Sequence, residues 1–188
     1  AYNYIIQYAE EHLMLNLKKI ILVGDSAGGN LCMGLCSLLV LRNMRLPDSL
    51  FLMYPALRID ADVFSPSKIV CLKDQILSIN FMLLVREAYI GNKKIIKDDY
   101  FASPVYTPNH ILKYFPRKVH MFVGTHDPLR DDTYRMLRKF TDVEVDCKLT
   151  EFKYFPHGFL NYDMPNMVPE ISEAYEYVLK EMENIITC

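Results

Sequence analysis

The chain has 188 residues, a formal net charge of -2 and apolar side chains at 51% of its positions. These values are typical of a single domain with an apolar core, and they argue against a disordered chain. Proteins that bind nucleic acid concentrate Lys and Arg on one face, and the nearly balanced charge gives no sign of this, so we expect no nucleic-acid partner.

Four short runs rich in aliphatic and β-branched residues predict strands. They are "IILV", "LFLMY", "VHMFVG" and "CKLTEF", beginning at Ile20, Leu50, Val119 and Cys147. Helical patterns lie between and after them, at 27–42, in two stretches across 74–89, at 132–140 and at 169–186. Strands that alternate with helices favour a parallel sheet with helices on both faces. We therefore expect an α/β fold with about four strands.

The segment 58–103 is longer than a plain connection between two parallel strands. It contains "SPSK", the two helical stretches, "GNKK" and "KDD". We predict that it forms a small helical cap over the carboxyl edge of the sheet. No repeat or linker divides the rest, so residues 1–188 are expected to form one domain.

The cysteines and the apolar runs bear on the compartment. Five widely spaced cysteines favour reduced thiols in an intracellular, cytoplasmic protein. Cys32 and Cys36 share a helix face, but no histidine or second cysteine pair accompanies them, so burial is expected rather than metal binding. We expect no metal and no cofactor. The longest apolar run, 31–41, is too short to cross a bilayer.

The stretch "GDSAGGN" carries the main chemical signal. Its first five residues form a G-x-S-x-G pattern centred on Ser26, between a predicted strand and a predicted helix. In this pattern a sharp turn lifts the serine hydroxyl above the sheet, and glycines avoid collisions with the strained backbone. The alternative is that Ser26 is a simple helix N-cap, which would explain neither the paired glycines nor the strand.

A serine needs an imidazole to accept its proton and a carboxylate to orient that imidazole. After this type of turn the partners follow in the order serine, acid, histidine. Asp127 in "GTHDPL" follows the third predicted strand, and His157 in "FPHGF" follows the fourth. Since parallel strands end at one edge of the sheet, we predict that Ser26, Asp127 and His157 meet there.

Other residues compete for these roles. His157 could instead be a loop histidine bonded to backbone, and His126 is adjacent to Asp127 but should point away from it. Asp131 and Asp132 are expected in the first turn of the next helix, where carboxylates offset the helix dipole. Asp25 is expected to serve a local turn or the substrate. The remaining histidines lie in patterns with no acid positioned for them: His12, His110 and His120.

Five motifs, in order, resemble the hormone-sensitive lipase family of α/β-hydrolases: "GDSAGGNL", "YPAL", "FASPVY", "HDPLRDD" and "FPHGF". The resemblance runs from about residue 17 to the final helix and corresponds to the C-terminal part of the catalytic domain of eukaryotic members. It implies carboxylic-ester hydrolysis through an acyl-enzyme, with Ser26 as nucleophile, His157 as general base and acid, and Asp127 as the orienting carboxylate.

The family also carries an HGGG-type segment before the nucleophile, whose N–H groups form most of the oxyanion hole. The sequence contains no such segment, which leaves the N–H of Ala27 as the expected donor. The chain also begins at Ala1 within a helical pattern, so we expect a fragment of a longer enzyme or a degenerate copy.

Three functions follow as alternatives: an ester hydrolase acting on a small ester or acyl lipid, a non-catalytic ligand-binding remnant, and a peptidase of the prolyl-oligopeptidase type. "YPAL" and "SP" argue against the peptidase, and the presence of His157 favours chemistry over binding alone. The resemblance also suggests peripheral association with lipid droplets or membranes.

Overall fold

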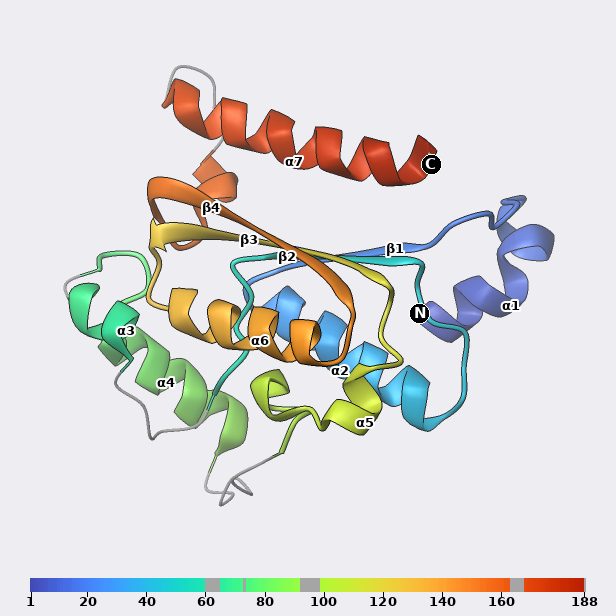
Figure 1. The fold of residues 1–188 in the computed structure, drawn as a ribbon, viewed down its shortest axis with the longest axis horizontal. Helices are drawn as coiled ribbons and strands as arrows, with labels where there is room; N and C mark the ends of the chain where they lie inside the picture. Colours follow the sequence, from blue (N-terminus) through green and yellow to red (C-terminus); the bar gives the residue numbers. More distant parts are fainter. Residues whose placement is uncertain (60–64, 73, 92–98, 163–167, 188) are drawn as a thin grey trace.

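The computed structural model describes residues 1–59, 65–72, 74–91, 99–162 and 168–187. Its centre is one sheet of four strands in the order β1-β2-β3-β4, and every neighbouring pair is parallel (Figure 1). The strands are β1 (Ile21–Asp25), β2 (Ser49–Met53), β3 (Lys118–His126) and β4 (Asp146–Pro156). The predicted α/β class and the predicted strand number are both confirmed.

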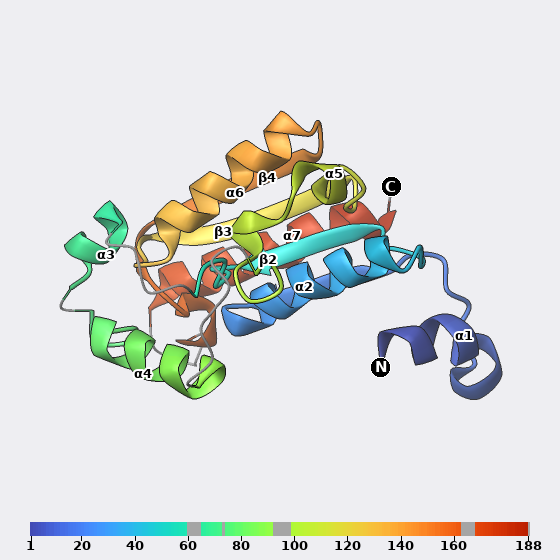
Figure 2. The ribbon, with the colours of Figure 1, turned by 90° about the horizontal axis from the view of Figure 1, so that it is seen from below.

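Helices cover both faces of this sheet, as expected. Helix α7 (Pro169–Thr187) lies along one face, and α2 (Ala27–Leu41) and α6 (Arg130–Asp142) lie along the other, as the views in Figures 1 and 2 both show. The first helix, α1 (Tyr2–Leu13), lies to one side of these layers. Three short helical turns lie in the connections: η1 (Pro104–Tyr106), α5 (Asn109–Leu112) and η2 (Phe159–Tyr162).

The second strand shows why the sequence folds in layers. Leu50 and Leu52 pack into the core beneath α2 and α6, whereas Phe51 between them packs with Phe122 and Val178 of the α7 layer. Successive side chains of a strand point to opposite faces, so an apolar run such as "LFLM" suits a strand that is buried on both sides. Strand β2 is therefore packed between an apolar core on each face of the sheet.

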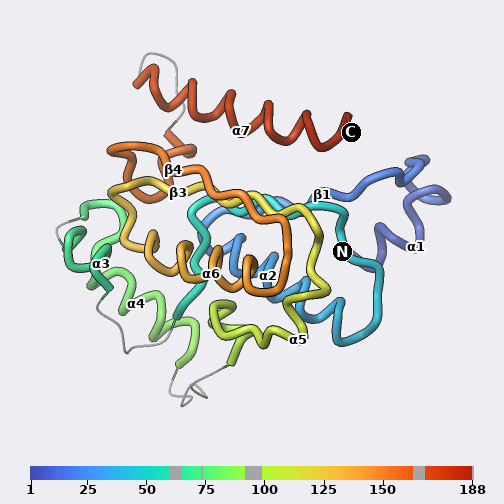
Figure 3. Tube along the Cα trace, in the orientation of Figure 1, coloured from blue at the N-terminus to red at the C-terminus, as the bar shows by residue number. Residues whose placement is uncertain are grey.

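The structure describes only part of the predicted cap. Helices α3 (Pro66–Val70) and α4 (Ile79–Ile90) lie beyond the carboxyl ends of the strands (Figure 3). Residues 60–64, 73 and 92–98, which include parts of "GNKK" and "KDD", lie outside the described residues. The boundaries 58–103 therefore stay a prediction.

The prediction of two helical stretches across 74–89 is wrong. The first part of that segment is a turn, in which Asp74 Oδ1 accepts hydrogen bonds from the N–H groups of Ile76 and Leu77. Only the second part is helical, and Ser78 begins it by accepting from Phe81 N–H. Short aspartate side chains compete with the helix for local N–H groups, which explains the turn. The other cap helix lies earlier, in "PSKIV".

Cys32 and Cys36 both lie in the core between α2 and the sheet. Burial raises the pKa of Cys32 to about 11 and raises the pKa of Cys36 further, so both thiols stay protonated near neutral pH. Among the described residues no group of three or more potential ligand side chains could hold a metal ion. None of the described helices has the length and apolarity needed to cross a bilayer.

Candidate active site

Ser26 occupies a strained turn between β1 and α2. Its backbone has φ 47° and ψ -114°, a conformation that residues other than glycine rarely adopt and that is found at functional turns. The turn is held by a hydrogen bond of 2.9 Å from Ser26 N–H to the carbonyl of Met53. Ser26 stands at the N-cap position of α2, yet its hydroxyl makes no capping hydrogen bond. The simple capping alternative therefore does not account for this residue.

The glycines around Ser26 differ in what they allow. A Cβ at Gly24 would lie 2.4 Å from the carbonyl oxygen of Gly28, so this position needs glycine. A Cβ at Gly29 would lie 2.7 Å from Pro55. At Gly28 the nearest atom would be Asp25 Oδ1 at 3.6 Å, an ordinary contact. The expectation that both glycines of the G-x-S-x-G pattern avoid a collision is therefore wrong for Gly28.

Ser26, His157 and Asp127 meet at the carboxyl edge of the sheet. Ser26 Oγ lies 2.8 Å from His157 Nε2, and His157 Nδ1 lies 2.9 Å from Asp127 Oδ2. Asp127 is fully buried and His157 is 6% exposed. A carboxylate only accepts hydrogen bonds, so Nδ1 carries the proton and Nε2 is left free to accept the serine proton. The arrangement can therefore draw a proton away from the hydroxyl of Ser26.

Neighbouring groups hold this arrangement in place. The other carboxylate oxygen of Asp127, Oδ1, accepts a hydrogen bond of 2.7 Å from Leu129 N–H. The ring of Tyr54 meets the imidazole of His157 edge-on, with 5.1 Å between the ring centroids. Tyr54 is itself buried, with its hydroxyl 3.4 Å from Asn161 Nδ2, and burial raises its pKa well above the usual value. The acid and the imidazole are thus fixed from several sides.

The competing residues lie elsewhere. His126 is exposed, and its Nδ1 is 3.1 Å from Thr125 Oγ1. Asp131 and Asp132 lie in the first turn of α6, as predicted, and Asp25 is exposed at the end of β1.

The expectation that two other histidines lack an acid is wrong. His120 Nδ1 lies 3.3 Å from Glu181 Oε2, and His12 Nε2 lies 3.8 Å from Glu11 Oε1. Glu11 is adjacent to His12 on α1, whereas Glu181 reaches His120 from α7. His110 lies in the short helix α5.

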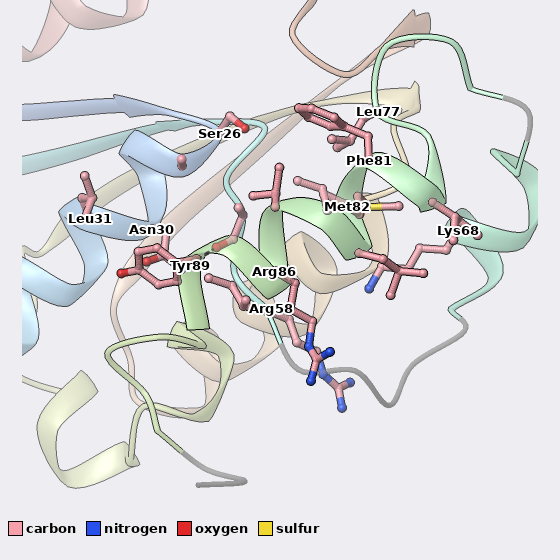
Figure 4. Close-up of a pocket in the computed structure, with 17 residues that line it drawn as sticks. Ser26, Asn30, Leu31, Arg58, Lys68, Leu77, Phe81, Met82, Arg86 and Tyr89 are labelled. Atoms are coloured by element: carbon pink, nitrogen blue, oxygen red, sulfur yellow. Dashed lines mark hydrogen bonds between the residues drawn. The ribbon is translucent and has the colours of Figure 1, made fainter. Parts of the chain in front are cut away.

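An apolar cavity of about 490 Å³ opens beside Ser26. Figure 4 shows Ser26 on one side of it, with Phe81, Leu77 and Met82 facing it from α4 and the turn before it. Helix α4 has no buried residue, so much of its apolar surface is available to this cavity. Ala27, at the start of α2, also lines the cavity, and first-turn N–H groups have no partner within their own helix.

Asn30, the last residue of "GDSAGGN", also lines the cavity, and the sequence pattern did not single it out. Asn30 is buried, and its Nδ2 donates to the carbonyls of Ala56 and Ala102 at 2.8 and 2.9 Å. It thereby ties α2 to the "YPAL" and "FASP" segments. The sequence feature that could have indicated its role is a polar residue in the first turns of an otherwise apolar helix.

Comparison with known proteins extends these observations. The chain is 33% identical to mouse hormone-sensitive lipase over 86 residues, which are 46% of this chain and 11% of that protein. It is 36% identical to the human hormone-sensitive lipase over 76 residues, 40% of this chain and 7% of that protein. The matched stretches thus span about a tenth of the length of these relatives or less.

The fold has solved counterparts as well. A hyperthermophilic esterase from Pyrobaculum calidifontis superposes with a TM-score of 0.87 at 21% identity, over 99% of this chain and 57% of that one. The family model described as alpha/beta hydrolase fold matches residues 1–161. With the sheet, the turn at Ser26 and this match in agreement, the chain belongs to the alpha/beta hydrolase fold family.

Proposed function

We propose that the chain is the part of a serine carboxylic-ester hydrolase that carries the nucleophile, the base and the acid. The observation that carries the proposal is the continuous hydrogen-bonded path from Ser26 Oγ to His157 and on to Asp127 Oδ2, with distances of 2.8 and 2.9 Å. Supporting it are the strained turn at Ser26 and the esterases and lipases among the relatives.

The proposed reaction has two halves. In the first, Ser26 Oγ attacks the ester carbonyl carbon while His157 Nε2 takes the hydroxyl proton, and the proton is then given to the departing alcohol as the C–O bond breaks. In the second, a water gives its proton to His157 and attacks the acyl-enzyme, which releases the carboxylic acid and returns the proton to Ser26. Asp127 keeps the imidazole oriented and stabilises its protonated form.

Negative charge develops on the carbonyl oxygen in both halves. Within this chain the proposed donor to it is the backbone N–H of Ala27, at the positive end of the α2 dipole. Removal of one such donor typically costs about 3 to 4 kcal/mol, so the N–H of Ala27 would be a substantial part of the site.

The proposed substrate has an apolar acyl group. The cavity beside Ser26 has about 490 Å³ of space, and its lining is dominated by aliphatic and aromatic side chains.

We also propose that the cap contacts lipid surfaces, because Val70, Leu84 and Tyr89 of α3 and α4 are each more than 60% exposed. Sedimentation with neutral-lipid emulsions tests this, and Leu84→Asp should reduce the bound fraction.

A series of p-nitrophenyl esters tests the proposed reaction. We expect kcat/KM to rise from acetyl to medium-length acyl chains, because each buried CH₂ contributes about 0.8 kcal/mol to binding. A folded protein that binds these esters without releasing p-nitrophenol would contradict the hydrolase proposal and favour a binding role. A protein that cleaves only peptide substrates would favour the peptidase alternative.

A further inference from the structure

The short cap helix α3 is hydrogen-bonded to the loop that carries Asp127. Ser67 Oγ donates to the carbonyl of Pro128 at 2.9 Å, and Ser67 N–H donates to Asp131 Oδ2 at 2.9 Å. The N–H of Asp131 points back to Ser67 Oγ at 3.5 Å. Ser67 is only 2% exposed, so these bonds form away from competing water. A single cap residue thus bonds the segment on the C-terminal side of the acid three times.

The direction of the hydrogen bonds around Ser67 is determined by proton count. A hydroxyl has one proton, and a carbonyl only accepts, so the Ser67 proton is committed to Pro128. The hydroxyl of Ser65, 3.0 Å from Ser67 Oγ, must therefore donate to it. Ser65 Oγ in turn accepts from Lys68 N–H at 3.4 Å. Each hydroxyl is used as donor and acceptor, which fixes the orientation of Ser67.

Helix α3 also contacts the other side of Asp127. The Cys71 thiol donates to the carbonyl of His126 at 3.3 Å. Lys68 Nζ lies 3.8 Å from the buried carboxylate of Asp132 at the start of α6. The carbonyls of the residues on either side of Asp127, His126 and Pro128, are therefore both hydrogen-bonded by α3 and the residue that ends it.

We infer that Ser67 is a positioning residue for Asp127, an inference that rests on the proposed ester hydrolase function. The two oxygens of Asp127 must reach Leu129 N–H and His157 Nδ1 at once, at 2.7 and 2.9 Å. That geometry requires a fixed backbone on both sides of Asp127, and Ser67 supplies the shortest of the bonds from α3 that fix it.

The same junction connects the cap to the chemistry. Lys68 of α3 and Leu129 of the acid loop both line the cavity beside Ser26. A substrate in the cavity would therefore lie against the residue that follows Ser67 and the residue that follows its partner Pro128. The cap therefore both holds the backbone around Asp127 in place and forms a wall of the acyl pocket.

The test compares Ser67→Ala with the wild-type chain and with Ser78→Ala. Ser78 is the control because, like Ser67, it is a serine at the N-terminal end of a cap helix; it accepts from Phe81 N–H and makes no described bond to the acid loop. The first readout is the downfield proton resonance of His157 Nδ1–H, which reports its bond to Asp127 without requiring turnover. The second is the rate at which a fluorophosphonate labels Ser26.

We expect the resonance to be sharp in the wild type and in Ser78→Ala, and broadened or lost in Ser67→Ala. The labelling rate of Ser67→Ala should fall about tenfold, because small displacements of a catalytic group reduce rates by up to about a hundredfold. Ser67→Thr, which keeps the hydroxyl, should restore both. If Ser67→Ala does not fold, Cys71→Ala provides the same test, with a smaller change of the same sign.

The outcomes separate the inference from the proposed function. If Ser67→Ala is folded and shows the wild-type resonance and labelling rate, the inference is overturned while the ester hydrolase proposal stands. If the wild type is never labelled but the resonance is lost only in Ser67→Ala, the inference on the carboxylate holds and the proposed function fails. Equal losses in Ser67→Ala and Ser78→Ala would indicate a general effect of cap stability and would overturn the inference.

Discussion

Two regions of this fold each bring together a hydroxyl, an imidazole and a carboxylate. At the carboxyl edge of the sheet these groups belong to Ser26, His157 and Asp127. On the face covered by α7, His120 Nε2 lies 2.9 Å from Thr150 Oγ1, and His120 Nδ1 lies 3.3 Å from Glu181 Oε2. The chemical groups are similar, but the surroundings are not.

The α7-face group is enclosed by aromatic rings and used for packing. The imidazole of His120 stacks on Phe122 with 4.0 Å between centroids, and Lys148 Nζ holds Glu181 at 2.9 Å. The sheet-edge group differs because Ser26 stands in a strained turn, at the start of a helix and beside a cavity. Access to a cavity and nearby backbone N–H donors, rather than the three side chains alone, therefore distinguish a candidate catalytic site.

Removal of the Ser26 hydroxyl should reduce kcat more than any other change. Ser26→Ala should lower kcat for p-nitrophenyl esters by up to about 10⁶-fold, the effect typical of removing a serine nucleophile. Thr150→Val, the matched loss of a hydroxyl on the α7 face, should leave kcat within about twofold. Steady-state kinetics on both variants measure the difference. Equal losses would mean that the sheet-edge group has no special role.

The second effect concerns the two carboxylates. Asp127→Asn should lower kcat about 10⁴-fold, because the amide favours the imidazole tautomer that cannot accept the serine proton. Glu181→Gln should leave kcat nearly unchanged, since Glu181 bonds Lys148 and His120 away from the cavity. Circular dichroism checks that both variants fold. An Asp127→Asn protein with wild-type turnover would rule out the proposed role of Asp127.

A third prediction concerns the glycines of the strained turn. Gly24→Ala should lower the free energy of unfolding by about 3 kcal/mol, because its Cβ would lie 2.4 Å from the Gly28 carbonyl oxygen. Gly28→Ala should change it by less than about 1 kcal/mol, because the nearest contact is ordinary. Urea unfolding of the two variants measures the contrast, and similar losses in both would contradict the geometry of the turn.

The smallest effect is a pH dependence of stability on the α7 face. Burial, with a contribution from Lys148, lowers the pKa of His120 from 6.5 to about 4, although Glu181 opposes the shift. Between pH 6.5 and 4 the unfolded chain therefore binds a proton that the folded chain does not. Stability from this group is complete above pH 6.5 and is lost toward pH 4, by on the order of 2 kcal/mol.

His120→Gln isolates that contribution because it removes the titration. Urea midpoints of the wild type and His120→Gln should converge as the pH falls from 6.5 to 4, or the wild type should become the less stable of the two. A difference between them that is independent of pH would show that His120 does not titrate in this window. The charged groups that act on it, Glu181 and Lys148, and Tyr177, which bonds Lys148, are the same in both proteins.

The sequence predicted the sheet and the placement of three polar residues because both depend on short-range patterns. Ser26, Asp127 and His157 each follow a strand, and parallel strands end at one edge, so their meeting could be expected. The position of Glu181 beside His120 could not be predicted from the sequence, because it depends on how α7 is rotated against the sheet. The contacts of Ser67 with the acid loop depend in the same way on tertiary packing rather than on local pattern.

The central claim is that the hydroxyl of Ser26 is activated by His157 and Asp127. Reaction of the folded chain with a fluorophosphonate, followed by peptide mass spectrometry, tests it most directly. We expect a covalent adduct on the peptide containing Ser26, formed much faster than on any other serine and absent from His157→Ala. A folded wild-type chain without an adduct on Ser26, or with equal labelling in His157→Ala, would contradict it.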